Sequence, residues 1–300
     1  MSGRLGLSVA VVRACLRDGG GGSPTAVMYD AALSDDERCR VPVVAGTSHA
    51  VFVSVYGGSV DPPSVGLRFF TAEGELPACG HGTVAALAFL AGRAERAERA
   101  EGAEYRVVLR AGGRDFVGWG VREGAYVRAG FDAGPVELRE PTVVECDPVL
   151  SALGIGIGIG SSVADGIRVA SVGRARLLVP VATRSVLAAL DPDFERLRAA
   201  CDRVGFLGCY VYSVPTSTGR VAARMFAPSI GVAEDIANAN STACLAAHLA
   251  TGRGRVDLAV DMGDSLGSPA TITATTRPGP SGPLIQLGGT AEIAGNIRLL

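Results

Sequence analysis

Short runs of β-branched and aromatic residues recur along the whole chain, and Gly, Pro, Asp and Ser separate them. This alternation is typical of strands joined by turns. It predicts strands at residues 7–14, 25–30, 50–57, 105–113, 174–182, 209–214, 256–263 and 270–276. Helical patterns are fewer, at residues 34–41, 83–100, 186–204 and 241–252. Many strands with few helices predict an α+β fold in which sheets wrap around helices.

Two segments in different halves of the chain resemble each other. Residues 67–87 read LRFFTAEGELPACGHGTVAAL and residues 223–247 read ARMFAPSIGVAEDIANANSTACLAA. Each has an Arg and a Phe, a turn with acidic residues, a cluster of small and polar residues and an Ala-rich helix. The arginines Arg68 and Arg224 are 224 − 68 = 156 residues apart, about half the chain. This predicts two similar domains that share one strand–loop–helix element.

Composition and charge narrow the range of partners. The chain is 48% hydrophobic and 19% charged, which is typical of a globular protein. Its net charge is −2 without a basic stripe, so we expect no nucleic-acid or membrane partner but a small molecule or another protein chain. No apolar run approaches the ~18 residues of a membrane span, and the N-terminus reads as a first strand rather than a signal peptide. Seven irregularly spaced cysteines without a C-x-x-C pair favour a reducing, cytoplasmic setting.

Two biased runs predict surface structure rather than chemistry. GIGIGIG at 154–160 lacks the spacing of a nucleotide-binding loop and is interpreted as a glycine-rich surface loop. RAERAERAEGAE at 93–104 is interpreted as the solvated end of a helix and its exit loop.

The segment LPACGHGTVAALAFL, residues 76–90, places a thiol, an imidazole and two glycines at the start of a helix. It reads as a nucleophile, a metal site or a cradle for an anion. Small residues at a helix start leave backbone N–H groups uncovered, and the helix dipole makes that end partially positive. Two such ends facing each other would grip a carboxylate or stabilise an enolate, although ordinary tight packing of the helix starts is the alternative.

The ionisable groups are few. A metal site would need about three or four ligands at suitable spacing, and Cys79 and His81 stand two apart with no second pair nearby, so no metal is expected. His248 lies within a helical pattern and is expected to be structural. His49 precedes a predicted strand, and a His on a loop there is an acid–base candidate.

Four ordered segments resemble the PhzF family of phenazine-biosynthesis isomerases, within the diaminopimelate-epimerase-like superfamily. GSPTAV at 22–27 is similar to the family's G-N-P-x-A-V, and GTSHAVFV at 46–53 stands where members carry S-E-T-x-F-V. RFFTAEGELPACGHGT at 68–83 is similar to R-x-F-T-P-x-x-E-L-P-F-A-G-H-P-T. RMFAPSIGVAEDIANANSTACLAAHL at 224–249 is similar to R-M-F-x-P-x-x-G-x-x-E-D-x-A-T-G-S-A.

The resemblance implies two pseudo-symmetric domains, 1–135 and 136–300, each a curved sheet around a central helix, with the active site in the cleft between them. It also implies a homodimer that needs no metal or organic cofactor. PhzF moves a double bond by proton transfer with a single glutamate, assisted by the histidine of the G-H pair and the aspartate of the E-D pair.

Carried over by residue, the resemblance assigns catalysis to His81 and Asp235 and puts His49 where the family has its glutamate. The family's Gly-Ser falls on Ala239 and Asn240, so the second half has diverged. Substrate-binding residues are expected at both helix starts: Cys79, Gly80, Gly82, Thr83, Ala239, Asn240 and Ser241.

The leading hypothesis is a cofactor-independent isomerase that shifts a C=C double bond in a small unsaturated cyclic amino acid of secondary metabolism. A pyrroline-2-carboxylate diene of the 4-alkylproline antibiotic pathways is one such substrate. One alternative is an amino-acid racemase or epimerase that uses Cys79, although Asn238 stands where the second thiol would be needed. The other is a non-catalytic ligand-binding homologue.

Overall fold

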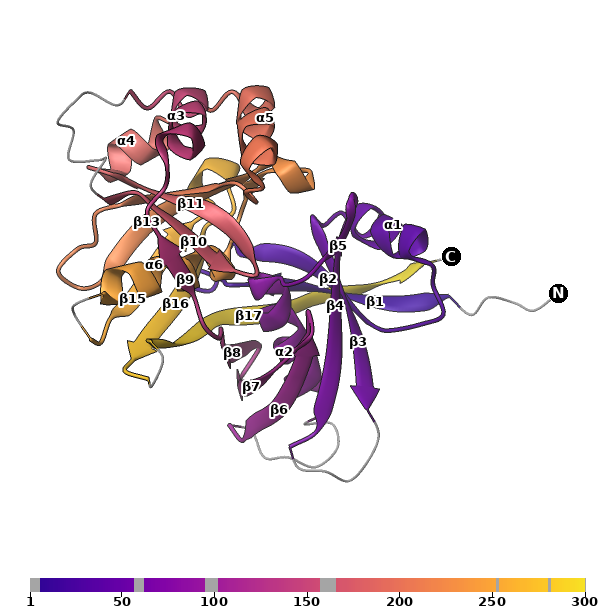
Figure 1. Ribbon diagram of the computed structural model, residues 1–300. Helices are drawn as coiled ribbons and strands as arrows, with labels where there is room; N and C mark the ends of the chain where they lie inside the picture. The colour runs from indigo at the N-terminus through magenta and orange to yellow at the C-terminus, as the bar shows by residue number, and fades with distance from the viewer. Residues whose placement is uncertain are drawn as a thin grey trace. The chain divides into compact units, whose positions relative to one another are not determined.

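The computed structural model describes residues 6–56, 62–94, 102–156, 166–251, 254–279 and 282–299. The chain folds into two compact units: unit 1 runs up to Asp132 and resumes at Gly288, and unit 2 is Ala133–Leu287 (Figure 1). Each unit has a sheet of many strands with few helices, so the predicted α+β fold is confirmed. The predicted glycine-rich loop at 154–160 and the predicted helix end and exit loop at 93–104 lie largely outside the described residues.

Unit 1 is a sheet wrapped around one helix, α2. Neighbouring strands pair in the order β17–β1–β2–β3–β4–β6–β7–β8, with β5 also on β4 and β8 also on β17. The pairs β2–β3 and β4–β6 are parallel and the others with a described register are antiparallel. The elements are β1 (Leu7–Ala14), β2 (Ser23–Tyr29), α1 (Asp35–Ala45), β3 (His49–Tyr56), β4 (Ser64–Thr71), β5 (Gly74–Leu76), α2 (Gly80–Ala94), β6 (Glu104–Ala111), β7 (Arg114–Glu123), β8 (Tyr126–Asp132) and β17 (Leu284–Leu299), which belongs to this unit from Gly288 on.

α2 is central because its sequence is apolar on nearly every side. Residues 80–91 are all buried, and a helix that is hydrophobic all round has to lie inside the protein. α2 packs against β1, β2, β3, β7 and β8. Gly118 of β7 permits the close approach, since a Cβ there would lie 2.9 Å from Leu87 Cδ2 and 2.8 Å from Leu109 Cδ1.

Unit 2 repeats this plan around α6. Its strands pair in the order β9–β10–β11–β12–β13–β15–β16, with β14 also on β13, and the pairs β11–β12 and β13–β15 are parallel. The elements are β9 (Glu137–Arg139), α3 (Val143–Ala152), β10 (Arg168–Val172), β11 (Arg174–Val181), α4 (Arg184–Ala188), α5 (Phe194–Val204), β12 (Cys209–Ser213), β13 (Arg220–Ala227), η3 (Pro228–Ile230), β14 (Val232–Asp235), α6 (Ala239–Ala250), β15 (Asp257–Met262), η4 (Asp264–Leu266) and β16 (Ala270–Arg277).

The helix predicted at 186–204 is two helices in the structure. α4 ends at Ala188 and α5 begins at Phe194. Pro192 lies in the break, where it disfavours a helical conformation of the residue before it. The side chain of Asp193 then caps α5 by accepting from the amide of Arg196 at 3.0 Å.

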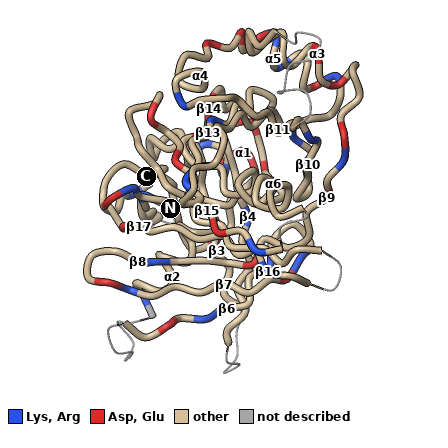
Figure 2. The backbone as a smooth tube through the Cα atoms, turned by 90° about the vertical axis from the view of Figure 1, so that its left-hand side faces the viewer, with Lys and Arg blue, Asp and Glu red and all other residues tan. Residues whose placement is uncertain are grey.

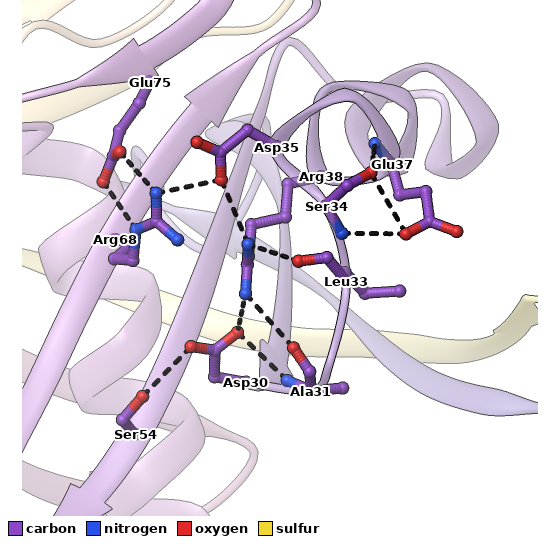
Figure 3. Close-up of polar contacts among 10 residues, drawn as sticks. All are labelled: Asp30, Ala31, Leu33, Ser34, Asp35, Glu37, Arg38, Ser54, Arg68 and Glu75. Carbon is purple, nitrogen blue, oxygen red and sulfur yellow. Dashed lines mark hydrogen bonds and ion pairs between the residues drawn. The ribbon is translucent and has the colours of Figure 1, made fainter.

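The repeated strand–loop–helix element holds the same ion pair in both units. In unit 1, Arg68 on β4 donates to Glu75 on β5 at 2.8 and 2.6 Å (Figure 3). In unit 2, Arg224 on β13 donates to Glu234 on β14 at 2.9 and 2.8 Å. The sequence similarity therefore reflects the same ion pair in each unit, which joins the short strand β5 to β4 in unit 1 and β14 to β13 in unit 2.

Charged residues of both signs are interspersed along the chain, as the colours of Figure 2 show. The chain contains no lysine, so every side chain that carries a permanent positive charge is an arginine. Among the described residues, no helix combines the length and apolar character that crossing a membrane requires.

Candidate active site

His49 is the first residue of β3, and the loop before it is closely fixed. α1 ends at Ala45, and its C-cap Gly46 has the left-handed conformation (φ 66°, ψ 33°) that terminates many helices. The Thr47 hydroxyl donates to the carbonyl oxygen of His49 at 2.9 Å, and the Ser48 hydroxyl lies 2.9 Å from His49 Nδ1. The Ser48 contact engages Nδ1, so Nε2 is the other ring nitrogen that can take part in chemistry.

The second part of this site is the first turn of α2. The carbonyl of Cys79, the residue before the helix, accepts from the amide and the hydroxyl of Thr83, both at 2.9 Å. Cys79 Sγ lies 3.5 Å from His81 Nε2 and 3.9 Å from its Nδ1. A Cβ at Gly82 would lie 3.0 Å from Cys79 Sγ and 3.1 Å from Val51 Cγ2, so tight packing explains the glycine there.

The sheet register brings these two parts together. β3 and β4 are antiparallel, and Ala50 at the start of β3 lies opposite Phe70 near the end of β4. From there the chain turns through β5 directly to Cys79 and α2. The start of β3 and the start of α2 therefore meet, although His49 and Cys79 are 79 − 49 = 30 residues apart.

Three side chains converge at that meeting point. The rings of His49 and His81 lie 4.5 Å apart between centroids and are nearly perpendicular, at 87°. One ligand-type atom each of His49, Cys79 and His81 lies within 4.8 Å of the other two. All three residues are buried, with 2%, 5% and 2% of their surface exposed.

Burial sets the charge of His49. It lowers the pKa of His49 well below its ordinary value of 6.5, and the positive charge that His81 can carry lowers that pKa further. The His49 imidazole is therefore neutral near pH 7 and carries a lone pair that can accept a proton.

Sequence spacing predicted no metal, and that absence stays a prediction. That prediction counted only Cys79 and His81, because no further pair stands near them in the sequence. The fold adds His49 as a third group, so the number of available ligands reaches the minimum for a zinc site.

The predicted residues of the second half form their own cluster in unit 2. Asp235 ends β14 and is buried, and its carboxylate accepts from the Asn238 side chain at 3.0 Å and the Ala237 amide at 3.3 Å. Asn238 is the N-cap of α6 and accepts from the amide of Ser241 at 2.9 Å. Ala239 is buried and Asn240 half-buried in the first turn.

This cluster explains why a thiol is absent at position 238. The Asn238 side chain caps α6 and ties it to Asp235, so it serves the helix start. Cys244, farther along the helix, is fully buried. Burial raises its pKa, which leaves a neutral thiol rather than a second acid–base group.

Sequence reasoning missed Arg176, a fully buried arginine on β11 with 1% exposure. Its Nη1 donates to the Ser241 hydroxyl at 3.0 Å and its Nη2 to the carbonyl of Arg174 at 2.7 Å. Nε has no partner among the described residues, and no carboxylate there forms an ion pair with this side chain. A charged residue inside the apolar run RARLLVPV was the available signal.

A family model described as phenazine biosynthesis-like protein matches residues 14–295. The chain belongs to this family. It is 29% identical over 290 residues to an uncharacterized isomerase of Deinococcus radiodurans, covering 91% of this chain and 88% of that relative. A PhzF-family phenazine biosynthesis protein of Bacillus anthracis matches the fold with a TM-score of 0.77 at 18% identity, covering 98% of this chain and 99% of that one. A predicted epimerase of Pseudomonas aeruginosa gives 0.78 at 23% identity, with the same coverage.

These likenesses confirm three predictions: the PhzF-like family, the diaminopimelate-epimerase-like fold and the isomerase class. The solved structures, at 18% and 23% identity, support the fold alone. The substrate, the bond that moves and the roles of individual residues belong to the proposal that follows.

Proposed function

We propose that this phenazine biosynthesis-like protein shifts a C=C double bond by proton transfer in a small unsaturated cyclic amino acid, with His49 as the acid–base group. One observation carries the proposal. His49 is a buried, neutral imidazole that meets His81 and Cys79 at the position where the family pattern has its acid–base glutamate.

In the proposed reaction, His49 Nε2 removes a proton from a carbon that conjugation has made acidic. The electron pair delocalises towards the substrate carboxylate, and the double bond moves as His49 returns a proton to another carbon. Burial keeps the imidazole in its base form at neutral pH, and the lowered pKa means that it gives up an acquired proton readily. The chain has no lysine that could take this role.

Of the remaining predicted residues, His81 and Asp235 enter the proposal as groups that assist His49, and the others as substrate contacts. His81 orients His49 through their ring contact, and the first turn of α2 at Gly80, Gly82 and Thr83 binds the carboxylate or the developing enolate. Asp235 and the first turn of α6 at Ala239, Asn240 and Ser241 are included on the family's sequence pattern. That both helix starts serve one site stays a prediction.

A pyrroline-2-carboxylate diene is the substrate class we propose, in an antibiotic pathway of secondary metabolism, for a homodimeric enzyme. Support comes from the family model and from the presence of His49 where the family pattern has glutamate, because this replacement alters the reach and charge of the acid–base group. Light scattering on the purified chain tests the dimer.

The test is a reaction in D2O, followed by NMR and mass spectrometry. Pyrroline-carboxylate dienes and dihydro-hydroxyanthranilate are incubated with wild-type protein, His49→Gln, and His248→Gln as the matched control on α6. Deuterium at a ring or side-chain carbon together with a moved double bond, lost in His49→Gln but kept in His248→Gln, supports the proposal. Turnover that survives His49→Gln refutes the role of His49.

A racemase that uses Cys79 is the second candidate, because the thiol lies 3.5 Å from His81 Nε2. It predicts exchange confined to the α-carbon that Cys79→Ser abolishes and His49→Gln leaves intact. A non-catalytic homologue predicts that a ligand binds with equal affinity to wild type and His49→Gln, with no exchange in either.

A further inference from the structure

The cluster of His49, Cys79 and His81 has a composition that proton transfer alone does not require. It offers two imidazoles and one thiol, all three buried, with ligand-type atoms within 4.8 Å of one another. Nitrogen and sulfur ligands select zinc and other thiophilic transition metals over magnesium or calcium, which prefer oxygen. It is the one cluster of this kind found among the described residues.

The separations agree with those around a tetrahedral zinc ion. Bonds of about 2.3 Å to sulfur and about 2.1 Å to nitrogen, meeting at the tetrahedral angle, place the two ligand atoms about 3.6 Å apart. Cys79 Sγ lies 3.5 Å from His81 Nε2, but it is also 3.9 Å from Nδ1, so the His81 ring has to turn for its Nε2 lone pair to face an ion held by the thiol. The three ligand-type atoms lie within 4.8 Å of one another, so side-chain rotation has to shorten the longest separation by roughly an ångström at most.

Neighbouring residues hold the three side chains of the cluster in place through hydrogen bonds and packing, as the partners of metal ligands do. Ser48 contacts His49 Nδ1 at 2.9 Å, which fixes the orientation of the His49 ring beside the other two residues. Cys79 is held by the bonds from Thr83 to its carbonyl, at 2.9 Å. Gly82 leaves room beside the thiol, because a Cβ there would lie 3.0 Å from Sγ.

We propose that His49, Cys79 and His81 bind zinc(II), and that the bound ion takes His49 out of proton transfer. Binding forms two nitrogen–zinc bonds and one sulfur–zinc bond, and the thiol proton leaves to solvent without a redox step. The fourth coordination position takes water or a carboxylate. The ion occupies the Nε2 lone pair of His49, so zinc acts as a reversible inhibitor; this second clause rests on the proposed function.

Cobalt(II) tests the site directly, because a thiolate ligand gives a charge-transfer band in the near ultraviolet and tetrahedral coordination gives strong visible bands. The full chain is titrated with cobalt(II), and zinc(II) is then added in competition. We expect one ion per chain, a thiolate band lost in Cys79→Ser, and an affinity at least about 100-fold lower in His49→Gln, since even second-shell changes cost about 10–100-fold.

Two variants serve as matched controls. Cys39→Ser removes a thiol that is more exposed than the other six, and His248→Gln removes the third histidine of the chain. Both should bind cobalt(II) like the wild type. Circular dichroism and thermal unfolding establish that each variant is folded before its affinity is compared.

Metal binding and isomerase activity are measured in separate experiments, so one proposal can be refuted without the other. Stoichiometric binding that depends on Cys79 and His49 supports the metal site whether or not an isomerase substrate is found. No saturable binding at micromolar cobalt(II), or a thiolate band that persists in Cys79→Ser or disappears in Cys39→Ser, overturns it. Turnover that continues unchanged in the zinc-loaded protein overturns the inhibitory clause.

Discussion

The internal repeat supplies two ion pairs of the same design in different surroundings. Side-chain exposure is 36% and 40% for Arg68 and Glu75, but 12% and 6% for Arg224 and Glu234. Changing each glutamate to glutamine keeps the size of the side chain and removes its charge. Glu75→Gln and Glu234→Gln therefore compare the same change at an exposed pair and at a mostly buried pair.

The magnitude follows from burial. Removing one partner of a buried ion pair costs about 3–5 kcal/mol, because the other charge is left uncompensated. Arg224 keeps two carbonyl acceptors, Leu190 at 2.7 Å and Leu187 at 3.2 Å, so we expect the lower end, about 3 kcal/mol. Glu75→Gln should cost about 0–1 kcal/mol, as exposed pairs do, and Asp35 remains 3.0 Å from Arg68 (Figure 3).

Urea unfolding of the full chain measures both losses. With a slope of about 2 kcal/mol per molar urea, the midpoint should fall by about 1.5 M for Glu234→Gln and by less than about 0.5 M for Glu75→Gln. Hydrogen exchange assigns each loss of stability to one unit, because β13 and β14 belong to unit 2 whereas β4 and β5 belong to unit 1. Equal losses, or a larger loss for Glu75→Gln, would refute the reasoning from burial.

Three further predictions rest on single positions. Below pH 6.5 the unfolded chain binds a proton at His49 that the folded chain does not. The free energy of unfolding should therefore fall by up to about 1.4 kcal/mol for each pH unit below 6.5. Thermal unfolding between pH 5 and 8 measures this, and the unfolding temperature should depend less on pH in His49→Gln than in the wild type. Gly82→Ala should cost about 1–3 kcal/mol by crowding Cys79, whereas Gly295→Ala, with nothing within 4 Å of its Cβ, should leave the urea midpoint unchanged. Arg176→Met should change stability by less than about 1 kcal/mol, since it removes a buried charge that has no carboxylate partner among the described residues; a loss of 3 kcal/mol in urea would contradict this.

Several elements were predictable because their patterns are local. The strands at 7–14 and 270–276 agree with β1 and β16 to within a residue, since both are dense in β-branched residues. β7, with charged residues at both ends and two inner glycines, was not predicted because its place depends on α2, against which it packs. α3 was missed because Pro148 interrupts its pattern, although Thr142 and Glu145 form a capping box that signals its start.

The sequence by itself determined the family, the fold class and the internal repeat, because motif order and strand or helix periodicity are properties of the chain. It also named His49, Cys79 and His81 one at a time. Only the tertiary structure decided that these three side chains meet, since the antiparallel register of β3 and β4 closes a separation of 79 − 49 = 30 residues. The structure likewise decided that Arg176 is buried and His49 neutral, because burial depends on segments packed from elsewhere in the chain.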